Sequence, residues 1–148
     1  EAWSHNPRIV VHGTPQHGVP RLAIVSFSII AGHKVRWRLR RAGIRLFMAC
    51  TSTDIGVLHA DAVHYNYVVA LLNDMFGIQA RGGCACAGPF GQALLGIDYQ
   101  LAKDIEDALL DDEESEVLRP GFTRIGFPYF MSDAKAQYII DAVDWIAR

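Results

Sequence analysis

Several features typical of other protein classes are missing from this 148-residue sequence. It has no excess of positive charge, because 14 Lys and Arg residues stand against 16 Asp and Glu residues. A protein that binds nucleic acid through an electrostatic surface usually has such an excess. The apolar run at residues 22–30 is too short to span a bilayer and lacks the flanks of a signal peptide. We therefore predict that neither nucleic acid nor a membrane is a partner.

Cysteine is also scarce, with three residues in the chain. An odd number without a regular spacing does not predict a disulfide framework, so we expect a reducing, cytoplasmic location. Cys84 and Cys86 are separated by one residue, and the histidines are scattered, so the paired ligand spacing of a zinc module is missing. We expect no metal site.

The composition that is present, 51% hydrophobic and 20% charged, predicts one compact domain over residues 1–148. Predicted strands and helices interleave, which indicates an α/β (α+β) class with a mixed or antiparallel sheet covered by helices. We predict strands at 8–12, 22–30, 44–50, 78–81 and 122–130, and helices at 61–76, 89–95, 99–111 and after Ser132. Residues 32–41 are basic and compatible with a helix, and residues 111–116 form an acidic, exposed loop.

Residues 81–89, with the sequence RGGCACAGP, place a thiol in a glycine-rich turn before a predicted helix. The adjacent glycines let the backbone turn sharply or approach a ligand, and Gly88-Pro89 is typical of a helix entry. Cys86 would lie near the helix N-terminus, where a thiolate is stabilised, with Arg81 adding positive charge. Cys86 is thus a nucleophile, a metal ligand or a small packed side chain. We interpret Cys84 as a packing residue.

Arg124 lies in an apolar strand, within residues 119–127. A guanidinium in such surroundings needs an anionic partner, and its planar shape suits a carboxylate bound by two hydrogen bonds. The partner is either the carboxylate of a ligand or a nearby Asp or Glu side chain. The spacing alone does not separate these two interpretations.

These residues carry a resemblance to a known family. Residues 67–98 resemble part of the small C-terminal domain of class V aminotransferases related to cysteine desulfurases, which are pyridoxal-phosphate enzymes of fold type I. The family pattern Arg-x-Gly-x-x-Cys-Ala-x-Pro is met by Arg81, Gly83, Cys86, Ala87 and Pro89. The similarity extends upstream to residues 21–27 and downstream to residues 120–124 and the last helix, about two-thirds of the chain. Residues 31–57 match nothing in the family and form an insertion or a diverged segment.

The resemblance implies a catalytic Cys86, which in desulfurases attacks the substrate sulfur and carries a persulfide. It also implies substrate binding by Arg124, which matches the arginine that holds the α-carboxylate, and by Arg81. Many desulfurases have histidines before the nucleophile, where this chain has Cys84-Ala85, so sulfur transfer does not follow directly. An aminotransferase or a lyase is compatible with the same loop.

In this family the pyridoxal phosphate and its Schiff-base lysine belong to a large domain that precedes the small one. We do not expect Lys34 to be that lysine, although Gly32-His33-Lys34 echoes its context, because residues 25–30 before it already match the small domain. The chain is therefore expected to be a fragment that is inactive alone and binds no pyridoxal phosphate itself. Its expected partners are the large domain or a complementing subunit, an amino-acid substrate in the intact enzyme, and a second copy in a homodimer. The alternative is a stand-alone interaction or small-anion-binding module without catalysis.

Overall fold

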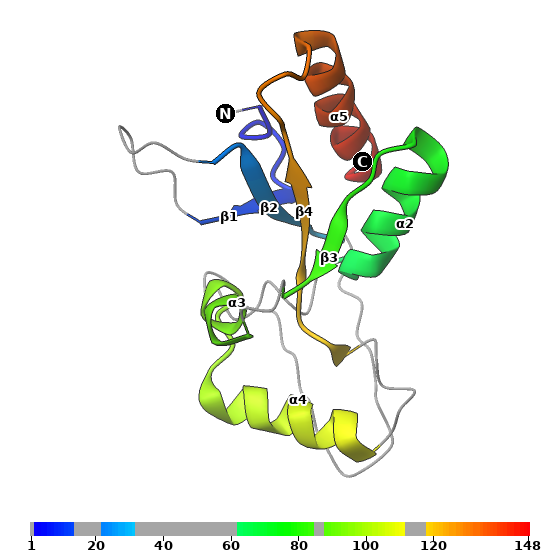
Figure 1. Cartoon of the computed structure of the whole chain (residues 1–148). Helices are drawn as coiled ribbons and strands as arrows, with labels where there is room; N and C mark the ends of the chain where they lie inside the picture. The colour runs from blue at the N-terminus through cyan, green and yellow to red at the C-terminus, as the bar shows by residue number, and fades with distance from the viewer. Residues whose placement is uncertain (1, 14–21, 32–61, 85–87, 112–117) are drawn as a thin grey trace.

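The computed structural model of the chain describes residues 2–13, 22–31, 62–84, 88–111 and 118–148 (Figure 1). Among these residues, four strands form one antiparallel sheet in the order β1-β2-β4-β3. The strands are β1 (Ile9–His12), β2 (Ile24–Ile29), β3 (Arg81–Gly83) and β4 (Phe122–Gly126). With the helices around it, this sheet confirms the predicted α+β class.

Two amphipathic helices, α2 (Tyr65–Phe76) and α5 (Asp133–Ile146), pack on one face of the sheet. Their ends follow local rules. α2 ends at Gly77, which adopts the left-handed conformation with φ 65°. α5 begins after Ser132, whose hydroxyl oxygen accepts a hydrogen bond from the Lys135 backbone N–H at 3.4 Å.

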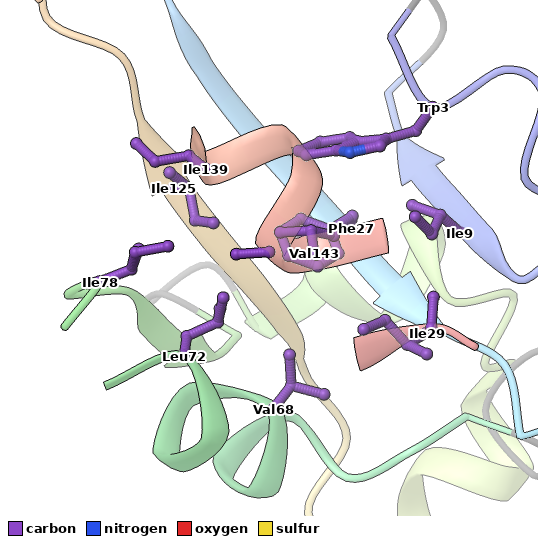
Figure 2. Packing of buried hydrophobic residues seen from close by; sticks show 12 residues of the cluster. Trp3, Ile9, Phe27, Ile29, Val68, Leu72, Ile78, Ile125, Ile139 and Val143 are labelled. Atoms are coloured by element: carbon purple, nitrogen blue, oxygen red, sulfur yellow. The ribbon is translucent and has the colours of Figure 1, made fainter. Parts of the chain in front are cut away.

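The main core lies between these two helices and the sheet (Figure 2). The sheet contributes alternate residues, because successive side chains of a strand point to opposite faces. At the centre Phe27, Leu72 and Val143 are 0% exposed. Burial of each such side chain stabilises the fold by roughly 1.5–3 kcal/mol. The further labelled members of the core are Trp3, Ile9, Ile29, Val68, Ile78, Ile125 and Ile139.

A smaller apolar cluster joins the sheet to the two remaining helices, α3 (Gly88–Leu94) and α4 (Tyr99–Asp111). Its buried members are Leu95, Ile97 and Phe122. Phe122 alternates with Thr123, so its ring lies on the face of β4 opposite the main core. Both faces of β4 are thus used, and the strand contributes Ile125 to the main core and Phe122 to the smaller cluster.

Most predicted elements are present, but several bounds differ from the prediction. β2 begins at Ile24 rather than at 22, and β3 ends at Gly83 rather than at 81. β3 begins at Arg81 rather than at 78, because the Ile78 N–H bonds the Leu72 carbonyl at 2.9 Å and so completes the end of α2. β4 ends at Gly126 rather than at 130, and the carbonyl of Pro128 accepts from the Met131 N–H in a turn. α2 begins at Tyr65 rather than at 61, since Ala62 forms a β-bridge with Ile30.

Other sequence predictions fall outside the described residues. These are the basic segment 32–41, the strand at 44–50, nearly all of the segment 31–57, and the acidic loop from 112 to 116. Nothing in the structure bears on them.

Candidate functional site

Two arginines lie directly opposite each other at one edge of the sheet. Arg81 of β3 and Arg124 of β4 are register partners, so their side chains project from the same face. Cβ atoms in such a pair are about 4.5–5.5 Å apart, and like charges placed there destabilise a sheet.

Arg124 is half-buried, whereas Arg81 is exposed. Among the described residues, no Asp or Glu forms an ion pair with Arg124, and no hydrogen bond of its side chain is present. The described part of the chain thus provides no Asp or Glu for the interpretation in which Arg124 forms a salt bridge within the protein.

Ser26 of β2 is the register partner of Arg124 on its other side, and His12 of β1 is the register partner of Ser26. These residues and the two arginines form one row across the sheet. His12 is buried, and its Nε2 lies 2.8 Å from the Ser28 hydroxyl oxygen. Its ring centroid is 5.5 Å from that of Phe122. Burial lowers the pKa of His12, so the ring stays neutral near pH 7. The positive charge of the row is therefore concentrated at its Arg124 and Arg81 end.

The glycines beside Arg81 make room for an aromatic ring. A Cβ on Gly82 would lie 2.6 Å from Cδ2 of Tyr65, and a Cβ on Gly121 would lie 2.6 Å from Cε1 of the same ring. Gly83 has φ 103°, which lets the chain turn after β3. Gly83 is the last residue of β3 and pairs with Phe122 of β4, so the predicted sharp turn at the glycines stays a prediction. The close approach at Gly82 is to Tyr65, which is 8% exposed.

A cleft of about 460 Å³ opens beside β3, between the start of α2, the α3–α4 unit and the segment that leads into β4. Arg81 and Arg119 line it, together with Asn66 and Gln92. The other lining residues are Tyr65, Gly82, Gly83, Cys84, Gly88, Gly91, Leu95, Leu109 and Pro120. The cleft therefore combines two positive charges with apolar walls.

Of the predicted site residues, the structure brings Arg81 and Arg124 together. Cys86 and Lys34 lie outside the described residues, so their positions are not given. Cys84 is a half-buried free thiol that lines the cleft, and a Cβ on Gly91 would lie 3.3 Å from its Cβ.

Sequence reasoning missed three polar residues of the cleft, Arg119, Asn66 and Gln92. Arg119 stands next to Pro120-Gly121, and its charge was a usable signal. Asn66 and Gln92 gave no such signal, because they belong to different helices and line the same cleft only in the folded chain.

The described lysines do not fit a role in pyridoxal-phosphate binding. Lys103 on α4 and Lys135 on α5 are exposed, and neither lines the cleft. Among the residues that the structure describes, no group of three or more His, Cys, Asp or Glu side chains could hold a metal ion. In the same part of the chain, no helix is long and apolar enough to cross a membrane.

Comparison with known proteins assigns no family. The chain matches no family model, and searches of the curated proteins and of the solved structures gave no significant match.

Proposed function

We propose that this chain is the small C-terminal domain of a pyridoxal-phosphate-dependent enzyme similar to class V aminotransferases and cysteine desulfurases. Its function there is to bind the carboxylate of an amino-acid substrate through Arg124, with Arg81 beside it. One observation carries the proposal. The half-buried Arg124 has an arginine as its register partner and no acidic partner among the described residues.

The chemistry of the two side chains supports a carboxylate as the ligand. A guanidinium group is planar and can donate two parallel hydrogen bonds to a carboxylate. Both arginines are on strands of the same sheet, which fixes their backbones more firmly than a loop would. A bound carboxylate would also lower the repulsion between the two positive charges.

The reaction itself would depend on groups outside this domain. Pyridoxal phosphate, held by the large domain, would supply the electron sink for amino-acid chemistry. The described residues of this chain supply orientation of the substrate and, at the cleft, apolar walls that limit water. Cys86 would act as a thiolate that accepts sulfur in a desulfurase, or would line the pocket in an aminotransferase.

The binding role is tested with Arg124→Gln. The probe is L-alanine, with L-alaninamide as the analogue that lacks the carboxylate, and binding is followed by NMR chemical-shift titration. Loss of a hydrogen bond to a charged group costs about 1.5–3 kcal/mol, so L-alanine should bind roughly 10- to 100-fold more weakly. Lys103→Gln removes one positive charge from α4 and is the control. Equal affinity of Arg124→Gln and wild type for L-alanine would contradict the proposal.

A stand-alone interaction module is the second candidate, and exposed aromatic side chains favour it. Tyr129 is 99% exposed and Phe130 77% exposed, and their rings form an edge contact with centroids 5.4 Å apart. A surface of this kind is typical of a protein-binding site when it is extensive.

Thiol reactivity separates the two candidates. Rapid alkylation of Cys86 by iodoacetamide, compared with the Cys86→Ser variant and followed by mass spectrometry, would support the enzyme. A Cys86 no more reactive than Cys84 would support the module, because a reactive thiol needs an electropositive, accessible environment.

A further inference from the structure

Three aromatic side chains form a cluster where the end of α2 meets α5. The ring centroids of Phe76 and Trp145 are 5.5 Å apart and those of Phe76 and Tyr138 are 6.4 Å apart, each pair with an interplanar angle of 68°. The Tyr138 hydroxyl donates a hydrogen bond to the Phe76 carbonyl oxygen at 3.0 Å. These contacts join the two helices and limit the orientations of the Tyr138 and Trp145 rings.

The two rings on α5 are nevertheless open to solvent. Tyr138 is 51% exposed and Trp145 is 50% exposed. Tyr and Trp are enriched at protein interfaces, where they contribute much of the binding energy. Because contacts within the protein already hold these rings, little conformational entropy is lost when a partner binds to them.

A carboxylate lies on the same outer face of α5, between the two rings along the helix. Asp141 follows Tyr138 by three residues and precedes Trp145 by four, and residues at this spacing share one face of a helix. Asp141 is exposed and accepts a hydrogen bond from the Gln137 side-chain amide at 2.8 Å. Within the described part of the chain, no Lys, Arg or His side chain forms an ion pair with Asp141.

The charge of the two helices favours a cationic partner. α2 has one Asp, and α5 has three Asp and one Lys, so their formal net charge is -3. The face of an aromatic ring attracts a cation, and a neighbouring carboxylate adds to this attraction. A guanidinium group uses both, because its plane stacks on the ring while its N–H groups donate to the carboxylate. The surface therefore fits an arginine side chain better than an apolar or an acidic one.

We propose that Tyr138, Asp141 and Trp145, with Phe76 behind them, form a docking surface for a basic, arginine-containing segment of another protein. An arginine of the partner stacks on one of the two exposed rings and donates hydrogen bonds to the Asp141 carboxylate. This inference does not depend on the proposed function. Arg124 projects from the face of the sheet opposite to the one that α2 and α5 cover.

The probe for this surface is acetyl-tri-arginine amide, compared with the same peptide in which citrulline replaces each arginine. Citrulline keeps the shape of arginine but is uncharged. Binding is followed by NMR titration of the full chain, with the Trp145 indole N–H as the reporter signal. An exposed cation–π contact and a surface ion pair together should make the arginine peptide bind roughly 3- to 30-fold more tightly. The difference should decrease at high salt, because ions screen exposed charges.

Two variants and a control locate the binding surface. Asp141→Asn keeps the shape of the side chain and removes its charge, so it should weaken binding of the arginine peptide about two- to fivefold. The affinity for the citrulline peptide should not change. Trp145→Leu removes the ring and should also weaken binding of the arginine peptide. Asp107→Asn, at an exposed position on α4, removes one negative charge elsewhere and should bind both peptides like the wild type.

Equal affinity of the wild type for the two peptides overturns the inference. An unchanged affinity of a folded Asp141→Asn variant for the arginine peptide does so as well, and so do peptide-induced shifts that leave the Trp145 signal unaffected. Sedimentation velocity adds a further check. A wild-type dimer that Trp145→Leu converts to a monomer would show that a second copy of the chain, and not a basic partner, covers this face.

Discussion

Replacement of Gly121 by alanine tests the packing that holds β3 against β4. The added Cβ would lie 2.6 Å and 2.7 Å from two carbons of the Tyr65 ring and 2.7 Å from the Gly83 Cα. Carbon atoms normally approach to about 3.5–4.0 Å, so the structure must open by roughly 1 Å. Tyr65 is buried at the base of α2 and Gly83 is backbone, so neither can move aside without disturbing the sheet.

We expect Gly121→Ala to lower the free energy of unfolding by about 1–3 kcal/mol, the usual cost of overpacking. Equilibrium urea denaturation followed by circular dichroism measures this change. Gly126→Ala is the matched control, because Gly126 ends the same strand and its added Cβ would meet nothing within 4 Å. That variant should be neutral or up to about 1 kcal/mol more stable. Equal stability of the two variants would refute the argument.

Three further changes test other parts of the fold. Leu72→Ala should cost about 2–5 kcal/mol of unfolding free energy in urea denaturation, since Leu72 is 0% exposed, whereas Met75→Ala on the same helix, 51% exposed, should cost far less. Similar losses would contradict the assignment of the core. Ser132→Ala should cost about 0.5–1 kcal/mol, the lower part of the range for an N-cap, because its hydrogen bond is long at 3.4 Å, and Ser132→Asp should restore the loss. The third change concerns pH. Burial lowers the pKa of His12 below its ordinary value of 6.5, so below about pH 6.5 the unfolded chain binds a proton before the folded chain does. Wild-type stability should therefore fall as the pH decreases through this value, and His12→Gln should lose less over the same interval. Parallel pH profiles of the two proteins would show that His12 is not the cause.

The sequence predicted the elements whose signals are local. The end of α2 at Gly77 follows from a glycine after an amphipathic pattern, and the bounds of α4 agree with the prediction. Ser132 was predicted as an N-cap from its position before the last apolar stripe, and its hydroxyl accepts the expected hydrogen bond. In these cases the residues that determine the structure are neighbours in the chain.

The site was only partly predictable because its geometry depends on distant residues. Arg81 and Arg124 were each identified from their local context, but their pairing depends on the register of β3 with β4. Gly82 was interpreted as a residue for a turn or a ligand approach, and Gly121 was not singled out, whereas the structure requires glycine at both positions because the Tyr65 ring lies against both. Tyr65 gave no signal beyond its place in the apolar pattern of α2. The role of Cys86 stays a prediction.

Contacts between the two ends of the chain bear on the order in which the protein folds. The Trp3 indole N–H donates to the Ile140 carbonyl at 3.1 Å, and the Asn6 amide donates to Asp144 at 2.9 Å. The Arg8 guanidinium donates to the carbonyls of Ala147 and Arg148. During synthesis from the N-terminus, residues 3–8 have no partners for these groups until α5 has left the ribosome. Residues 3–8 therefore gain these hydrogen bonds only after α5 and the residues that follow it have been synthesised.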